Sequence, residues 1–201
     1  MRFLRMRPLR IDLGDVLVQI IAVFLGVICA FGVNSWQTRN SEQALLRATL
    51  RGIVVEIQSN HDSLQTVKAR HATSLRALMG LLVKARTTKY ISITDLLLTL
   101  KNRGEFGINA PLDIAWQIAQ SNQGLSLLSY DDRYTLAALY RTQGVFYDAE
   151  RRYGDTLLSI RQSPTDNYLI ETIDLANQAN VVVVAETQLD ALYTDALKKI
   201  R

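Results

Sequence analysis

Residues 16–33 read VLVQIIAVFLGVICAFGV, which is apolar apart from Gln19 and glycine. No charged side chain occurs from Val16 to Thr38. At 1.5 Å per residue, eighteen helical residues span about 27 Å, close to the hydrocarbon thickness of a bilayer. Trp36 follows where an interfacial aromatic anchor is expected. The sequence therefore predicts one transmembrane helix over residues 15–36.

The charges beside this segment predict its orientation. Four arginines lie within residues 1–10, whereas the other flank offers only Arg39 before Glu42. Because basic flanks stay in the cytoplasm, we expect residues 1–14 to form a cytoplasmic basic tail. Residues 37–201 then form a periplasmic domain, anchored in a bacterial inner membrane.

A cleaved signal peptide is the alternative interpretation of the same segment. A basic region precedes the apolar run, and Ile28 and Ala30 provide a weak cleavage site. A lipoprotein is less favoured, because the residue before Cys29 is not small. The helical pattern continues past Trp36 without Pro or Gly until Gly52, which favours an anchor that continues into its domain.

Polar and small residues recur on one face of the membrane helix. Gln19, Ala22, Gly26 and Ala30 follow three- and four-residue steps, and such a ladder lets two helices approach closely. Gln19 can hydrogen-bond across the contact. We therefore expect packing onto an integral membrane protein partner or a second copy of the chain.

Asp12 and Asp15 lie at the cytoplasmic edge of the predicted span. Our main interpretation is that they cap the helix N-terminus at the level of the lipid headgroups, where the helix dipole favours negative charge. The functional alternative is that Asp15 titrates in a proton path, as in a motor-stator helix.

Composition excludes most familiar catalytic apparatus. The 201 residues include one Cys and two His, so an internal disulfide or a cluster of thiolate or imidazole metal ligands is excluded. No nucleophile-elbow motif is present. We expect no enzyme, no metal and no cofactor. Without the N-terminal arginines and the two aspartates, 19 basic and 17 acidic residues remain, so no nucleic-acid partner is expected.

The rest of the chain has helical periodicity. Apolar residues from Leu46 to Leu82 recur at helical spacing, Ser92 with Asp95 and Ser129 with Asp132 begin further helices, and Ser163-Pro164 with Asp166 caps a final one. A helix also opens near Asn109-Ala110-Pro111. The β-branched run 181–184 is kept helical because of its flanks. The predicted fold is all-α: one N-terminal transmembrane helix continuing into a periplasmic helical bundle.

Polar residues interrupt the apolar stripe of residues 46–82. Asn60 and His71 occupy positions on the seam, and a buried Asn fixes register. We expect His71 to be a hydrogen-bonded, half-buried imidazole and His61 to be solvated.

Aromatic residues gather in the second half of the chain. Trp116, Tyr130, Tyr134 and Tyr140 are candidates for a groove between helices that accepts a lipid tail or a peptide. Filling of the core is the simpler interpretation of such a stripe.

Several short motifs occur in a recognisable order. The membrane helix contains Leu25-Gly26-Val27 and ends in Val33-Asn34-Ser35-Trp36, and Glu56-Ile57-Gln58-Ser59-Asn60 follows. Further on come Ala115-Trp116 with Gln120, and Leu128-x-Tyr130-Asp131 leading to Tyr140 and Gln143. In these motifs and their order, the chain resembles a set of uncharacterised bacterial single-pass membrane proteins. It departs from their commoner form at Ser35 and Gln37, where charged residues are frequent. The resemblance implies topology and fold, and no activity.

These observations lead to an expected role. We expect a non-enzymatic accessory, scaffold or assembly subunit of an inner-membrane complex, in contact with the lipid bilayer and a membrane partner or a second copy. A periplasmic sensor module that binds a lipid or peptide is the alternative. A proton-coupled stator is a third possibility, which requires Asp15 to titrate in the membrane.

Overall fold

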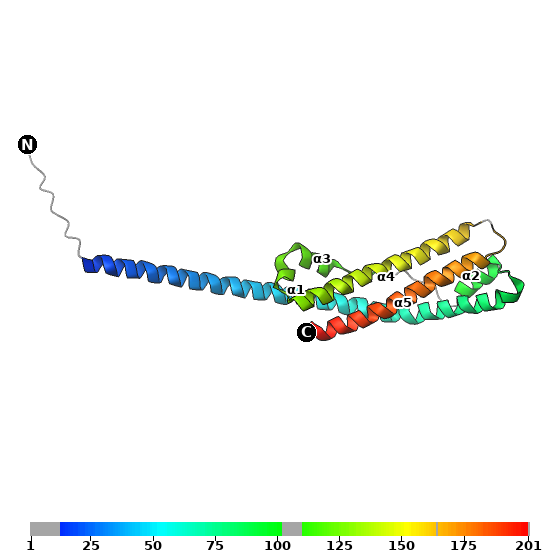
Figure 1. Cartoon of the computed structure of the whole chain (residues 1–201), viewed down its shortest axis with the longest axis horizontal. Coiled ribbons are helices and arrows are strands. Elements are labelled where there is room, and N and C mark those ends of the chain that lie inside the picture. Colours follow the sequence, from blue (N-terminus) through cyan, green and yellow to red (C-terminus); the bar gives the residue numbers. More distant parts are fainter. Residues whose placement is uncertain (1–12, 102–109, 164, 201) are drawn as a thin grey trace, which may run out of the picture. The chain divides into compact units, whose positions relative to one another are not determined.

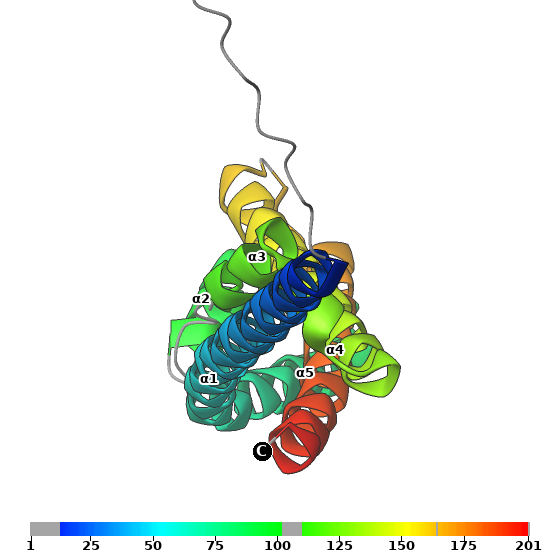
Figure 2. The same cartoon turned by 90° about the vertical axis from the view of Figure 1, so that its left-hand side faces the viewer.

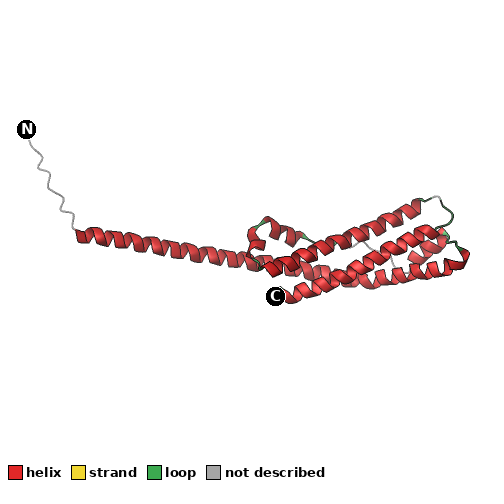
Figure 3. Ribbon diagram, viewed as in Figure 1, coloured by secondary structure: helices red, strands yellow, loops and turns green. Residues whose placement is uncertain are grey.

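The computed structural model describes residues 13–101, 110–163 and 165–200 (Figure 1). Every regular element in these ranges is helical, with no strand (Figure 3). The elements are α1 (Leu13–Thr88), α2 (Ile93–Lys101), α3 (Ile114–Ser121), the 3₁₀ helix η1 (Gln123–Leu127), α4 (Tyr130–Gln162) and α5 (Leu169–Lys199). The expected all-α class is confirmed.

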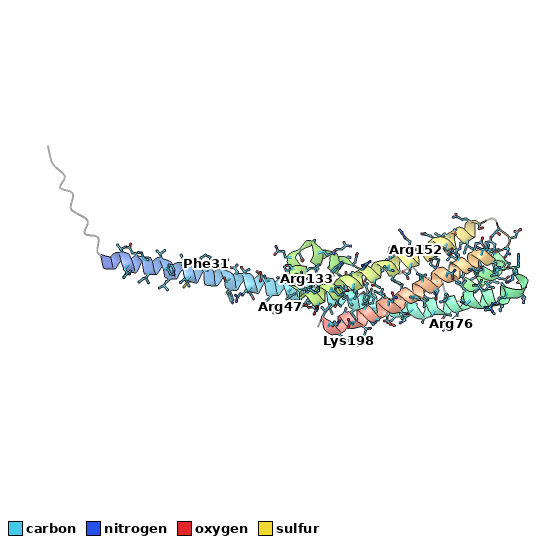
Figure 4. All side chains as sticks on the ribbon, viewed as in Figure 1. Phe31, Arg47, Arg76, Arg133, Arg152 and Lys198 are labelled. Carbon is cyan, nitrogen blue, oxygen red and sulfur yellow. The ribbon has the colours of Figure 1, made fainter. Side chains whose placement is uncertain are left out.

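The chain divides into two compact units after Leu45, and α1 contributes to both. The first unit contains the apolar part of α1, whose described side chains are all exposed; Phe31, for example, projects away from the helix (Figure 4). An 18-residue window of α1 has a mean hydropathy of 2.8 and none of it is buried. By length and composition, the described part of the chain thus has one helix that could span a membrane, and a signal sequence near the N-terminus meets the same criteria.

The second unit has its own hydrophobic core, built by α1, α4 and α5. In the nearly end-on view of Figure 2, α5 lies next to both other helices, and hydrogen bonds join it to each of them. Burial of large apolar side chains stabilises this unit. Its fully buried members include Ile53, Ile57, Leu64 and Leu78 of α1, Leu136, Leu139, Phe146 and Tyr153 of α4, and Leu175, Val182, Leu189 and Tyr193 of α5.

Two helix starts follow the sequence prediction. Ser129 caps α4: its Oγ accepts from the amide of Asp132 and donates to the Asp132 carboxylate, 2.7 Å away. Ser92 and Asp95 make the same pair of contacts at the start of α2. In each pair, the serine Oγ satisfies a backbone amide at the helix N-terminus that has no partner within the helix.

The predicted start of the last helix is wrong. The expected cap at residues 163–166 is followed by non-helical backbone, with Pro164 outside the described residues, and α5 begins only at Leu169. The physical reason is a tertiary tether. Asn167 donates to the carbonyl of Lys89 and accepts from the amide of Ile91, and the Tyr168 amide donates to Ile91. These bonds hold residues 167–168 against the turn after α1.

The predicted helix near Pro111 also begins later than expected. Ala110 and Pro111 are not helical, Asn109 lies outside the described residues, and α3 starts at Ile114. The reason lies in the contacts that α3 makes with α1, described below. The β-branched run 181–184 is helical as predicted, and it lies within α5.

We predict that Ser129→Ala lowers the free energy of unfolding by about 1 kcal/mol, because the Asp132 amide loses its capping acceptor. Chemical denaturation of the detergent-solubilised full chain measures the change. Ser159→Ala is the matched control, since Ser159 lies inside the same helix and its hydroxyl donates to the Thr156 carbonyl rather than to the start of the helix. Equal effects of the two substitutions would contradict the capping role.

Candidate functional site

A buried carboxylate of α1 holds the start of α3. The side chain of Glu56 accepts from the backbone amide of Ala115 at 2.6 Å and from that of Trp116 at 3.4 Å. It also accepts from the hydroxyl of Tyr140 on α4 at 2.6 Å. The N-cap residue of α3, Asp113, makes no capping bond with its side chain. Glu56, from 59 residues earlier in the chain, therefore supplies the anionic cap.

Asn60 lies one turn further along α1 and binds the peptide groups before α3. Its Oδ1 accepts from the amide of Leu112 at 2.8 Å, and its Nδ2 donates to the Leu112 carbonyl at 2.7 Å. A side-chain amide that pairs with both groups of one residue fixes that residue in position and orientation. Asn60 thus holds the segment before α3 through both the amide and the carbonyl of Leu112.

Gln143 of α4 completes this polar network. Its Nε2 donates to the Leu112 carbonyl at 2.8 Å, while its Oε1 accepts from the hydroxyl of Tyr193 at 2.8 Å and from Asn60 at 3.3 Å. Burial raises the pKa of the Tyr140 hydroxyl far above its ordinary value, and the bond to the Glu56 carboxylate raises it further. Tyr140 therefore stays protonated and keeps donating to Glu56. The result is a fixed junction of α1, α3, α4 and α5.

Close packing accompanies the network. An added Cβ on Gly124 of η1 would collide with the Thr49 side chain of α1, and an added Cβ on Gly52 would lie 3.7 Å from Ala115. Asn122 caps η1 by accepting from the Gly124 amide at 2.7 Å. Both short helices therefore lie directly on α1.

An aromatic pair next to the network lines a cavity. The rings of Trp116 and Tyr140 are stacked, with centroids 4.8 Å apart and planes at 11°. Both rings line a cavity of about 720 Å³ between α3 and α4, together with Asp113, Gln120 and Arg141 among others. Trp116 and Tyr140 are two of the four aromatic residues expected in a groove, and their rings are in contact. We call this space the α3–α4 cavity.

The other two groove candidates lie elsewhere. Tyr130 and Tyr134 are exposed on the first turns of α4, and neither lines the α3–α4 cavity. Their four-residue spacing puts them on one helix face, but that face is turned to solvent. Their assignment to the groove is corrected accordingly.

Two large apolar side chains are exposed on α3. Ile114 and Ile118, one turn apart, are 60% and 55% exposed, and Leu112 just before the helix is 48% exposed. Sequence reasoning did not single out these residues. The four-residue spacing of Ile114 and Ile118 is visible in the sequence. Which face of α3 packs against the rest of the unit is not, because the distant Glu56 holds the start of the helix.

Two further polar clusters join α1 to α5. His71 is fully buried, deeper than the half-buried position expected, and its Nδ1 bonds to the Glu186 carboxylate. His61 was expected to be solvated, which is wrong: its Nε2 lies 3.0 Å from Asp190 Oδ1. Lys68 Nζ lies 2.6 Å from Asp190 Oδ2. This hydrogen bond is the main reason why the pKa of Asp190 is lowered, and His61 and Gln65 lower it further.

A second cavity, of about 770 Å³, lies between the end of α1 and α2. Arg76 and Lys84 of α1 line it together with Tyr90 and Asp95. Asp95 already accepts from Ser92. Among the residues that the structure describes, no group of three or more His, Cys, Asp or Glu is placed to hold a metal ion.

The membrane-helix residues are placed as follows. Gln19, Ala22, Gly26 and Ala30 are exposed on α1, and a Cβ added to Gly26 would meet nothing within 4 Å. Trp36 is also exposed. Asp15 is the third residue of α1, whereas Asp12 lies outside the described residues.

Comparison with protein-family models, curated proteins and solved structures found no match to this chain.

We predict that Asp190→Asn lowers the free energy of unfolding by about 1 kcal/mol or less near pH 7, because the cluster is partly solvated. Folding lowers the pKa of Asp190, so its contribution is complete above the unfolded-state value of about 3.9. It disappears as the pH falls through the lower folded-state value. Denaturation of both proteins from pH 7 to pH 3 measures the difference.

The control is Asp148→Asn, at an exposed position of α4. A difference between wild type and Asp190→Asn that stays constant down to the lowest pH at which both fold would contradict the ion-pair account.

Proposed function

We propose that the chain is a non-enzymatic accessory subunit of a bacterial inner-membrane complex. In this proposal the N-terminus is cytoplasmic, the apolar part of α1 crosses the bilayer and the helical unit forms a periplasmic bundle. The subunit docks onto an integral membrane partner, or onto a second copy, with its membrane helix and with the outer surface of α3.

The surface of α3 is the observation that carries this proposal. An eight-residue helix is too short to be stable alone. Here two buried polar side chains of α1, Glu56 and Asn60, hold it in place, and the face directed outward carries Ile114 and Ile118. An apolar patch held rigidly at the surface is typical of a protein contact, because it loses little freedom on binding.

The membrane helix supports the same role. Gln19 is exposed within the apolar segment 16–33 of α1, and an amide in hydrocarbon gains from a hydrogen-bonded partner. Gly26 has open space around its Cα, so a neighbouring helix can approach closely there. Gln19 and Gly26 lie on one face of α1, which also carries Ala22 and Ala30.

A sensor that binds a ligand is the second candidate, favoured by the α3–α4 cavity. The stator alternative depends on Asp15 alone.

Native mass spectrometry of the full chain, extracted in mild detergent from its own membrane, tests the proposal. We predict that a partner or a second copy co-extracts with wild type, and that Gly26→Leu reduces the complex because the added side chain blocks close approach. Gly32→Leu is the matched control: Gly32 has the same open surroundings but lies on another face of α1.

The periplasmic contact is tested in the same way. Ile118→Asp should weaken the complex, whereas Leu158→Asp, at an equally exposed apolar position of α4, should not. A complex left intact by both Gly26→Leu and Ile118→Asp would contradict the docking proposal. An Asp15→Asn variant that assembles normally but is inactive in cells would favour the stator.

A further inference from the structure

The α3–α4 cavity contains an aromatic platform. Tyr140 is buried, whereas Trp116, stacked on it, is half-buried, so the indole presents the larger surface to the cavity. The lining beside it is mixed: the polar side chains of Gln117, Gln120 and Arg141 occur together with the small apolar residues Ala110, Pro111 and Ala137. A half-buried indole with polar side chains beside it is a surface on which a flat ligand with weakly polar C–H groups stacks.

The platform is fixed before any ligand arrives. Glu56 accepts from the Tyr140 hydroxyl and from the backbone amide of Trp116, so one buried carboxylate holds both stacked residues. Gln143, at the edge of the cavity, is itself held by Leu112 and Tyr193. Binding to such a rigid site costs little conformational entropy.

Unlike Gln143, several polar side chains around the cavity keep their hydrogen-bonding capacity. The side chains of Gln117, Gln120, Arg141 and Tyr147 line it, and none makes a hydrogen bond or an ion pair within the described ranges 13–101, 110–163 and 165–200. Two amides, a guanidinium and a hydroxyl are thus available beside the indole. With Asp113 opposite in sign to Arg141, the lining has no net charge.

We propose that the α3–α4 cavity binds a short neutral oligosaccharide. A pyranose ring has one apolar face of C–H groups, which suits the Trp116 platform, and a rim of hydroxyls that both donate and accept. The side-chain amides of Gln117 and Gln120 also both donate and accept hydrogen bonds. Asp113 accepts from hydroxyls and Arg141 donates to them, and because their charges offset each other the pair does not select a charged ligand.

Two other ligand classes fit the lining less well. A lipid tail would leave the polar groups of Gln117, Gln120 and Arg141 unpaired, which costs affinity. A strongly anionic ligand would gain no net electrostatic attraction, because Asp113 offsets the charge of Arg141. The volume of about 720 Å³ lies within the range of small-molecule sites. This site does not depend on the docking role proposed above.

The test uses the full chain in lipid nanodiscs or an amine-oxide detergent, because sugar-based detergents would compete. The Trp36→Phe variant leaves Trp116 as the only tryptophan, so its fluorescence reports the cavity. Cellotriose, maltotriose and tri-N-acetylchitotriose are titrated to about 10 mM. We expect saturable binding of at least one, seen as a change in Trp116 emission and confirmed by calorimetry.

Two variants locate the site. Gln120→Ala, an exposed substitution that leaves the core unchanged, should weaken binding about fivefold by removing one hydrogen-bonding group. Trp116→Ala should abolish calorimetric binding. Leu158→Ala, remote from the cavity lining, is the control and should bind as wild type does.

Three outcomes overturn the proposal. The first is no saturable binding of any of the three sugars by folded protein, and the second is binding that Gln120→Ala and Trp116→Ala leave unchanged. The third is binding of decanoate, a lipid tail, or of trialanine, a peptide, in preference to the sugars. Because these titrations use the purified chain, their failure would leave the co-extraction result standing. Loss of the complex with Gly26→Leu would equally leave sugar binding intact.

Discussion

The bond between the Glu56 carboxylate and the start of α3 is the constraint on which the candidate site depends. α3 has eight residues and no capping side chain of its own, so its position is set by an acceptor on another helix. The same carboxylate accepts from Tyr140, which links α3 to α4 through α1. The aromatic stack, the cavity and the exposed isoleucines of α3 all lie beside this contact, which Asn60 and Gln143 support.

The polar residues of α1 also define how the long helices pair. α5 carries apolar residues on both faces: Val182 is fully buried, while Val181 and Val184 are about half exposed. An apolar pattern of this kind does not by itself select one face or one register. The bonds of His71 to Glu186 and of Lys68 to Asp190 do select them, because a buried polar side chain needs its hydrogen-bonding partner in place.

Local signals in the sequence predicted local structure well. The caps at Ser92 and Ser129 were predictable because donor and acceptor are three residues apart, and the apolar run of α1 is visible in the sequence alone. The late start of α5 was not predictable, since it depends on the contact of Asn167 with the distant Lys89. His61 was misjudged for the same reason, as its partner Asp190 lies 129 residues away.

The candidate site was predicted only in part. Asn60 stood out as a polar residue on an apolar seam, and Glu56, Trp116, Tyr140 and Gln143 belong to short motifs that the sequence analysis singled out. Their spacing along the chain gave no indication that they share hydrogen bonds. Tyr130 and Tyr134 were grouped with them by residue type, although their helix face points away from the cavity.

Hydrogen–deuterium exchange of the full chain tests the role of Glu56 most directly. Glu56→Gln replaces one acceptor oxygen with a donor, so the three donors that meet there can no longer all be satisfied. The account predicts faster exchange in α3, residues 114–121, with the exchange of α5 unchanged and with Glu42→Gln behaving as wild type. Unchanged exchange in α3 of Glu56→Gln would contradict it.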